Sequence, residues 1–154
     1  MVAAEIEYLE EHLGRLQKAA DTLNYSYIIC KGIGIKEMYI AEEQDRFESL
    51  TAKFARLSDQ IIKQSIKLID ILDLDEPPET VRDSINRAEK KGLIESGIRF
   101  IEIRKLRNRI AHEYAESEED ISEIYKEVLQ STPLLFDSVN RIINYCRKHT
   151  SQLE

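Results

Sequence analysis

Hydrophobic positions along the chain recur at intervals of three and four residues, which is the spacing of one helix face. The first such stripe lies between Ile6 and Leu23. A second stripe begins at Phe47 and continues for about seven turns, as expected of a helix packed lengthwise in a bundle. Its members are Phe47, Leu50, Phe54, Leu57, Ile61, Gln64, Leu68 and Leu72.

Turn-forming residues separate these stripes from one another and from the rest of the chain. The segment 25–35 contains glycines and β-branched residues that interrupt the helical spacing, so we expect a connection there. Pro77 and Pro78 end the long stripe, because the residue before a proline resists the helical conformation. A short helix over 79–91 then follows, and Gly92 is placed to cap its end.

The last part of the chain predicts two more helices. Ser96 is positioned to cap the first of them. Its inner stripe is Phe100, Ile103, Arg107, Ile110 and Tyr114. The final helix begins near Ser117 and has a core face of Ile121, Ile124, Val128, Leu135, Val139, Ile142 and Cys146. With only five Gly and three Pro, the whole chain is expected to form one all-α domain over 1–154, an up-down bundle of about five helices.

Composition and charge narrow the possible environments and partners. A formal net charge of −7 argues against a protein that coats nucleic acid non-specifically. Cys30 and Cys146 have no metal or redox spacing, and we expect both to be reduced and partly buried. His12 and His149 are expected at the surface. Uninterrupted apolar runs reach only about four residues, far short of a membrane span, so no membrane partner is expected. Two cysteines without a secretory signal indicate a cytoplasmic protein.

A concentration of cations in the fourth predicted helix is the first chemical anomaly. Arg99, Arg104, Lys105, Arg107 and Arg109 lie close together with a single acid, Glu102, among them. By itself such a run most often forms a solvated helix face paired with acids. Here, however, Asn108, His112 and Tyr114 all lie within seven residues of Arg107.

Helix geometry limits how these side chains can meet. Asn108 and His112 are four residues apart and share a face. Arg107 and His112 are five apart, which is about 140° around a regular helix. The two therefore cannot converge on one phosphate from one straight helix. Either the helix breaks between them or a second copy of the chain completes the site, which favours a homodimer with a composite cleft on its two-fold axis.

The residue types suit cleavage of a phosphodiester bond in RNA. His112 can take a proton from a ribose 2′-hydroxyl or return one to the leaving oxygen. Arg107 can hold the non-bridging phosphate oxygens, and Asn108 can orient the imidazole or bind the phosphate. Arg104, Lys105 and Arg109 are the candidate substrate-binding cations. No metal-ligand spacing is present, so neither a metal site nor a cofactor is expected.

The string Arg107-Asn108-x-x-x-His112-x-Tyr114 resembles the signature of HEPN domains, specifically of HepT-type toxins encoded beside a minimal nucleotidyltransferase. The contexts of 44–50 and 91–97 are similar too, so the resemblance covers roughly residues 5 to 148. It implies a helical bundle that dimerises through the motif-bearing helices. It also implies a metal-independent endoribonuclease with Arg107 and His112 as catalytic residues, the toxin of a type VII toxin–antitoxin system.

The resemblance implies a partner as well. The cognate nucleotidyltransferase antitoxin would attach AMP to Tyr114, placing a bulky anion beside the cleft where it repels RNA. The overall negative charge suggests a narrow RNA target, such as a tRNA end or an mRNA. Two other functions stay open: a catalytically silent HEPN subunit that binds nucleotide or substrate for a partner nucleotidyltransferase, and a plain interaction protein whose cations make interhelical salt bridges.

Overall fold

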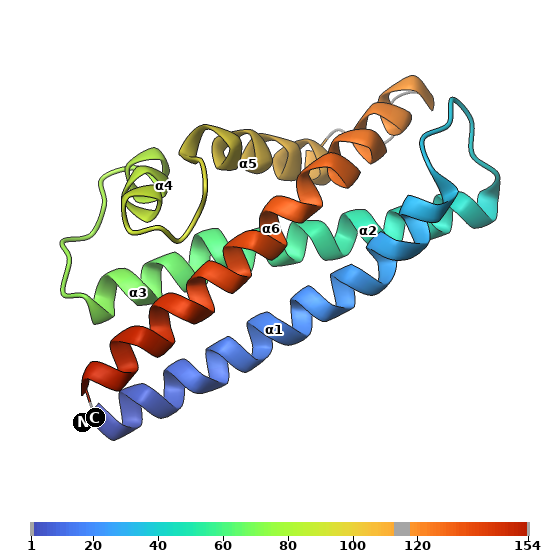
Figure 1. The fold of residues 1–154 in the computed structure, drawn as a ribbon. Coiled ribbons are helices and arrows are strands. Elements are labelled where there is room, and N and C mark those ends of the chain that lie inside the picture. Colours follow the sequence, from blue (N-terminus) through green and yellow to red (C-terminus); the bar gives the residue numbers. More distant parts are fainter. Residues whose placement is uncertain (1, 113–117, 154) are drawn as a thin grey trace.

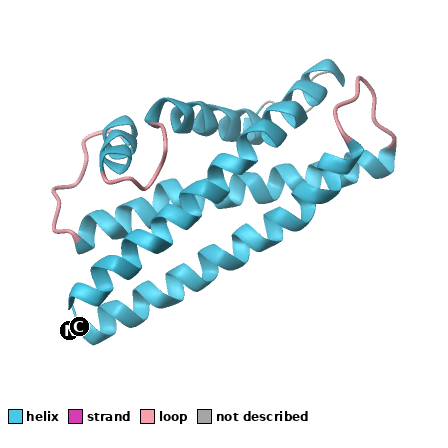
Figure 2. Ribbon diagram, in the orientation of Figure 1, coloured by secondary structure: helices cyan, strands magenta, loops and turns pink. Residues whose placement is uncertain are grey.

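The computed structural model describes residues 2–112 and 118–153, and all regular structure in those ranges is helical (Figures 1 and 2). The segments are α1 (Val2–Ile33), α2 (Ala41–Asp59), the π-helical segment η1 (Gln60–Ser65), α3 (Ile66–Leu72), α4 (Val81–Lys90), α5 (Gly97–His112) and α6 (Glu118–Leu153). Because α2, η1 and α3 follow one another without a break, the described chain forms five helical rods. This confirms the predicted all-α bundle of five helices.

The long helices run antiparallel to their neighbours in the chain (Figure 1). α1 packs along α2 and α6, while α5 packs against α2 and α6 on the other side of the bundle. The short α4 lies beside α5. Val2 and Leu153 come to the same end of the molecule. Within the described ranges, no helix is long and apolar enough to cross a membrane.

The first helix is longer than its hydrophobic stripe predicts. It continues through Ile33, so the expected connection over 25–35 is wrong for most of its length. Ser26 and Cys30 on this extension are buried, and their packing outweighs the weak helix propensity of the β-branched residues nearby. The helix ends at Gly34, whose φ of 81° and N–H bond to the carbonyl of Cys30 make the terminal turn.

The second rod follows the predicted stripe as far as Ile61 and then changes phase. η1 places an extra residue in one turn, which rotates everything after it by about one position. Gln64, predicted on the inner face, is therefore exposed, whereas Ser65 and Ile66 are buried. Leu68 is only partly buried. The periodicity identified the helix but could not show the π turn.

His12 is buried, and its expected place at the surface is wrong. It is 4% exposed, and its Nε2 lies 2.7 Å from the Ser65 Oγ in the π-helical segment. Burial, and secondarily the positive charge of Arg15, lowers the pKa of His12 below its usual value. His149 is partly buried and stacks on the ring of Tyr145. Both cysteines are buried free thiols, as expected.

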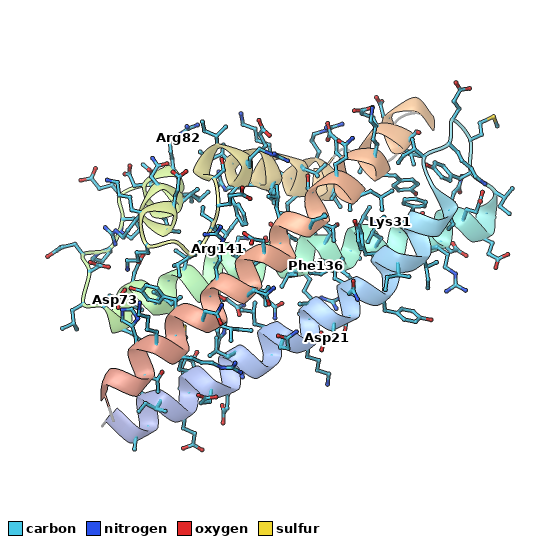
Figure 3. The ribbon with its side chains drawn as sticks, in the orientation of Figure 1. Asp21, Lys31, Asp73, Arg82, Phe136 and Arg141 are labelled. Atoms are coloured by element: carbon cyan, nitrogen blue, oxygen red, sulfur yellow. The ribbon has the colours of Figure 1, made fainter. Side chains whose placement is uncertain are left out.

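A cluster of ion pairs centred on Lys91 ties the end of α3 to the α4–α5 connection. Its Nζ lies 2.8 Å from both Asp70 and Asp73, and it also contacts Asp75. Although burial works in the opposite direction, hydrogen bonds to these carboxylates raise the pKa of Lys91. Tyr145 of α6 donates a hydrogen bond of 2.6 Å to Asp73, which lies at the end of α3 beside α6 (Figure 3).

The α4–α5 connection forms as the sequence predicts. Gly92 has a φ of 80° after the last turn of α4, and the Ser96 hydroxyl accepts a hydrogen bond from the backbone N–H of Arg99. Gly97 begins α5 in close contact with α4, since a Cβ there would lie 3.2 Å from the Asn86 Oδ1. Arg141 of α6 donates to the carbonyl of Gly92 (Figure 3). The start of α5 is thus fixed on several sides.

Replacing Lys91 with methionine should lower the free energy of unfolding by about 3 kcal/mol, because Asp70, at 4% exposure, would lose its closest cationic partner. Urea denaturation followed by circular dichroism measures this. Lys90→Met changes the same residue type at an exposed neighbouring position and should stay within about 0.5 kcal/mol of the parent. Equal midpoints for the two variants would show that the cluster does not stabilise the fold.

Candidate functional site

The motif residues lie on one unbroken helix. α5 runs from Gly97 to His112 without interruption, so the expected alternative of a helix break between Arg107 and His112 is wrong. The helix buries Phe100, Ile103 and Leu106 against the bundle. The side chain of His112 and the whole of Tyr114 lie outside the described residues, and so does the expected cap at Ser117.

Arg107 is the motif residue whose contacts the structure defines best. It lies at the edge of the buried face of α5, not at its centre as the inner stripe predicts, and it pairs with Asp59 at the end of α2. The Nε bonds to Oδ1 and the Nη2 to Oδ2, each at 2.9 Å. The two side chains are 25% and 29% exposed. This is a bidentate, partly buried pair that fixes the plane of the guanidinium.

The pair with Asp59 also determines which hydrogen-bond donors of Arg107 remain available to a ligand. The hydrogen bonds to Asp59 raise the pKa of Arg107, so the guanidinium stays charged. Nη1 makes no hydrogen bond to any described residue, and it can therefore serve an anionic ligand. The Arg107–Asp59 pair is also the kind of interhelical salt bridge expected of a plain interaction protein.

The sequence does not single out Asp59. It is one of 29 acidic residues, and it lies 48 positions before its partner. Its position four residues before Lys63 gives an ordinary helical ion pair, with 3.7 Å between Nζ and Oδ1. Only the packing of α5 on α2 reveals its role.

Two of the predicted substrate-binding cations lie on another side of α5. Lys105 and Arg109 line a depression of about 410 Å³ between α5 and α6. The Arg109 Nη1 lies 2.8 Å from the Oε2 of Glu127. Arg107 and Arg109 are two residues apart, about 200° around the helix, so the structure does not bring them together. Glu102 also lines this depression, which weakens its attraction for an anion.

Arg104 and Asn108 are exposed. Being four residues apart, they share the outward face of α5. Ile98 and Lys105 lie on the same side of α5 and are also exposed, whereas Ile101 between them is partly buried against the core. Ile98 is 74% exposed. This side of α5 is therefore exposed in the described chain.

The described parts of the chain contain no candidate metal-binding site. Across residues 2–112 and 118–153, no three His, Cys, Asp or Glu side chains are grouped so that they could hold an ion. The acids around Lys91 are instead neutralised by that ammonium group. The described members of the candidate site are Arg107, its partner Asp59 and the motif positions on α5.

Comparison of the sequence with protein-family models gives no match, and comparison with curated proteins gives none either. The similarity to HEPN domains thus depends on the residues of the motif and on the helical layout alone. The assignment of this chain to that family is a proposal.

Replacing Asp59 with asparagine should lower the free energy of unfolding by about 2 kcal/mol, because two charge-assisted hydrogen bonds in a partly buried place would be lost. Thermal and urea melts measure the change. Asp45→Asn, at an exposed position on the same helix, is the matched control and should leave stability within about 0.5 kcal/mol of the parent. An unchanged melt for Asp59→Asn would mean that the pair forms without holding α5 in place.

Proposed function

We propose that this chain is a HepT-type HEPN toxin, a metal-independent endoribonuclease whose catalytic groups are Arg107 and His112. The observation that carries the proposal is the state of Arg107: its guanidinium is fixed by Asp59 at the edge of the same unbroken helix that bears Asn108 and His112. A fixed cation with an uncommitted nitrogen suits a group that stabilises charge in a transition state.

A second copy of the chain completes the site in this proposal. Because α5 is unbroken, positions 107 and 112 lie about 140° apart around the helix of one chain. The exposed side chains of Ile98, Lys105 and Asn108 form a surface on which α5 of a second copy can pack, with the two-fold axis between the helices. Such a dimer brings the His112 of one copy toward the Arg107 of the other across the paired helices.

The reaction follows from these groups. His112 takes the proton of a ribose 2′-hydroxyl as the 2′-oxygen bonds to phosphorus. The bond from phosphorus to the 5′-oxygen breaks, and the imidazolium of the other copy's His112 protonates that oxygen. Arg107 holds the non-bridging oxygens while charge builds on them. The products are a 2′,3′-cyclic phosphate and a free 5′-hydroxyl.

Control by a partner is the second part of the proposal. A minimal nucleotidyltransferase antitoxin would join AMP to the Tyr114 oxygen, with pyrophosphate leaving from ATP. The added phosphodiester is anionic and sits two residues after His112 in the sequence. It would compete with the substrate phosphate for Arg107 and repel the RNA strand. The proposed setting for this pair is the cytoplasm.

One observation favours a catalytically silent subunit instead. The Asp59 carboxylate already occupies two donors of Arg107, and two acids, Glu102 and Glu127, line the depression beside Lys105 and Arg109. An acidic setting of this kind weakens RNA binding. In that case the chain would present nucleotide or substrate to the partner nucleotidyltransferase, and the partner would carry the activity.

Expressing the chain alone should slow bacterial growth, and His112→Ala or Arg107→Ala should relieve the effect. Removing a general base or an oxyanion donor should lower cleavage of RNA by about 100-fold or more. Growth curves and cleavage of total RNA by purified protein measure the two effects. Arg82→Ala, an exposed arginine on α4 that points away from the bundle (Figure 3), is the matched control.

The growth experiment also separates the alternatives. If both motif variants are folded and remain as toxic as the parent, the assigned chemistry is wrong. If the parent is not toxic but co-purifies with the neighbouring nucleotidyltransferase, the silent subunit is the better description. If Arg107→Ala lowers the melting temperature and changes nothing else, Arg107 contributes to the stability of the fold and not to catalysis.

Co-expression with a cognate nucleotidyltransferase should add one or more AMP groups to Tyr114. Intact-mass and peptide mass spectrometry measure the addition and locate it. Tyr114→Phe should abolish the added mass, whereas Tyr25→Phe, at an exposed tyrosine on α1, should leave it unchanged. Added mass on another residue would contradict the assignment of Tyr114.

A further inference from the structure

A second basic surface lies between α1 and α2, away from the depression beside α6. It is a pocket of about 280 Å³ lined by Arg15, Lys18, Ala19, Thr22, Lys53, Arg56 and Gln60. Four of these seven residues are cations, and none is an acid. In a chain of net charge −7, such a local excess of positive charge attracts anions.

The cations of this pocket are largely uncommitted. Arg15, Lys18 and Arg56 form no ion pair with any residue in the described parts of the chain. Lys53 is held in place by a 2.7 Å hydrogen bond to the Ser26 hydroxyl and lies over the ring of Tyr25, but it pairs with no carboxylate of the described residues. The charges are therefore available to a ligand.

Gln60 adds a second feature. Its Oε1 is buried and has no hydrogen-bond partner among the described residues. No hydrogen bond fixes which way the amide is turned, and with its nitrogen toward the pocket it can donate to a bound phosphate oxygen. An unsatisfied amide beside four cations indicates a binding site more than a solvated surface.

The pocket adjoins the turn of α2 that holds Arg107. Arg56 lies three residues before Asp59 and Gln60 directly follows it, and side chains three apart on a helix are separated by about 5–6 Å between Cβ atoms. The lining residues span about 10 Å along each helix, from Arg15 to Thr22 and from Lys53 to Gln60. The pocket is therefore elongated along α1 and α2, and its length exceeds that of a single phosphate group.

We propose that the pocket between α1 and α2 binds backbone phosphates of the RNA strand whose neighbouring phosphate is held at Arg107. This inference rests on the proposed ribonuclease function and gives the substrate a path over α2. Arg15 and Lys18 contact the strand from α1, and Lys53 and Arg56 contact it from α2. The ligand is a polynucleotide strand, not a free phosphate ion.

The test measures binding apart from cleavage. A fluorescent single-stranded 2′-O-methyl RNA has no free 2′-hydroxyl and cannot be cut, so anisotropy titrations report affinity alone. Arg15→Gln with Lys18→Gln should weaken binding roughly tenfold at low salt and reduce the slope of log affinity against log salt by about 1.4, or about 0.7 per lost contact. The control Arg82→Gln with Lys90→Gln makes the same charge change on α4 and should alter neither quantity.

Each other outcome has a definite meaning. Equal losses in the two double variants would overturn the pocket in favour of general electrostatics, and so would a parent protein that does not bind the oligonucleotide. Calorimetry with inorganic phosphate forms the second arm: binding by the parent but not by the pocket variant, with equal anisotropy, would assign the pocket to a free phosphate and overturn the proposal. Ordinary RNA that is bound through the pocket but never cleaved would refute the proposed nuclease while leaving the pocket in place.

Discussion

The bidentate pair between Asp59 and Arg107 is the contact on which the proposed site depends. A planar guanidinium bound through two parallel hydrogen bonds fixes the rotation of α5 about its axis relative to α2. With that rotation fixed and Phe100 and Ile103 buried, Ile98, Lys105 and Asn108 face away from the bundle. The same contact therefore sets both the orientation of the arginine and the surface available to a second copy.

The π-helical segment begins immediately after Asp59. Such single π turns are rare, and they are frequently found at functional sites. Here the change in phase buries Ser65 against His12, while Gln60, at the start of the segment, lines the basic pocket. The long rod thus serves two surfaces, one toward α5 and one toward α1.

The charges of this acidic chain are divided into paired and unpaired groups. Lys91 is surrounded by three carboxylates and fastens one end of the bundle. By contrast, Arg15, Lys18 and Arg56 have no carboxylate partner among the described residues, although the chain has more acids than bases. Paired cations hold elements together, whereas unpaired cations keep their attraction for external anions. The net charge therefore says little about where an anionic strand could bind.

The sequence by itself determined the helical class, the approximate ends of most helices and the motif on α5, because these depend on local periodicity and on capping residues. It did not reveal the extension of α1 to Ile33, the π turn or the burial of His12, since each depends on packing between distant segments. Only the tertiary structure brought Asp59 to Arg107 and Glu127 to Arg109. The partner of a side chain often lies on another helix of the bundle. The periodicity of one helix does not show which residues of a neighbouring helix will pack against it.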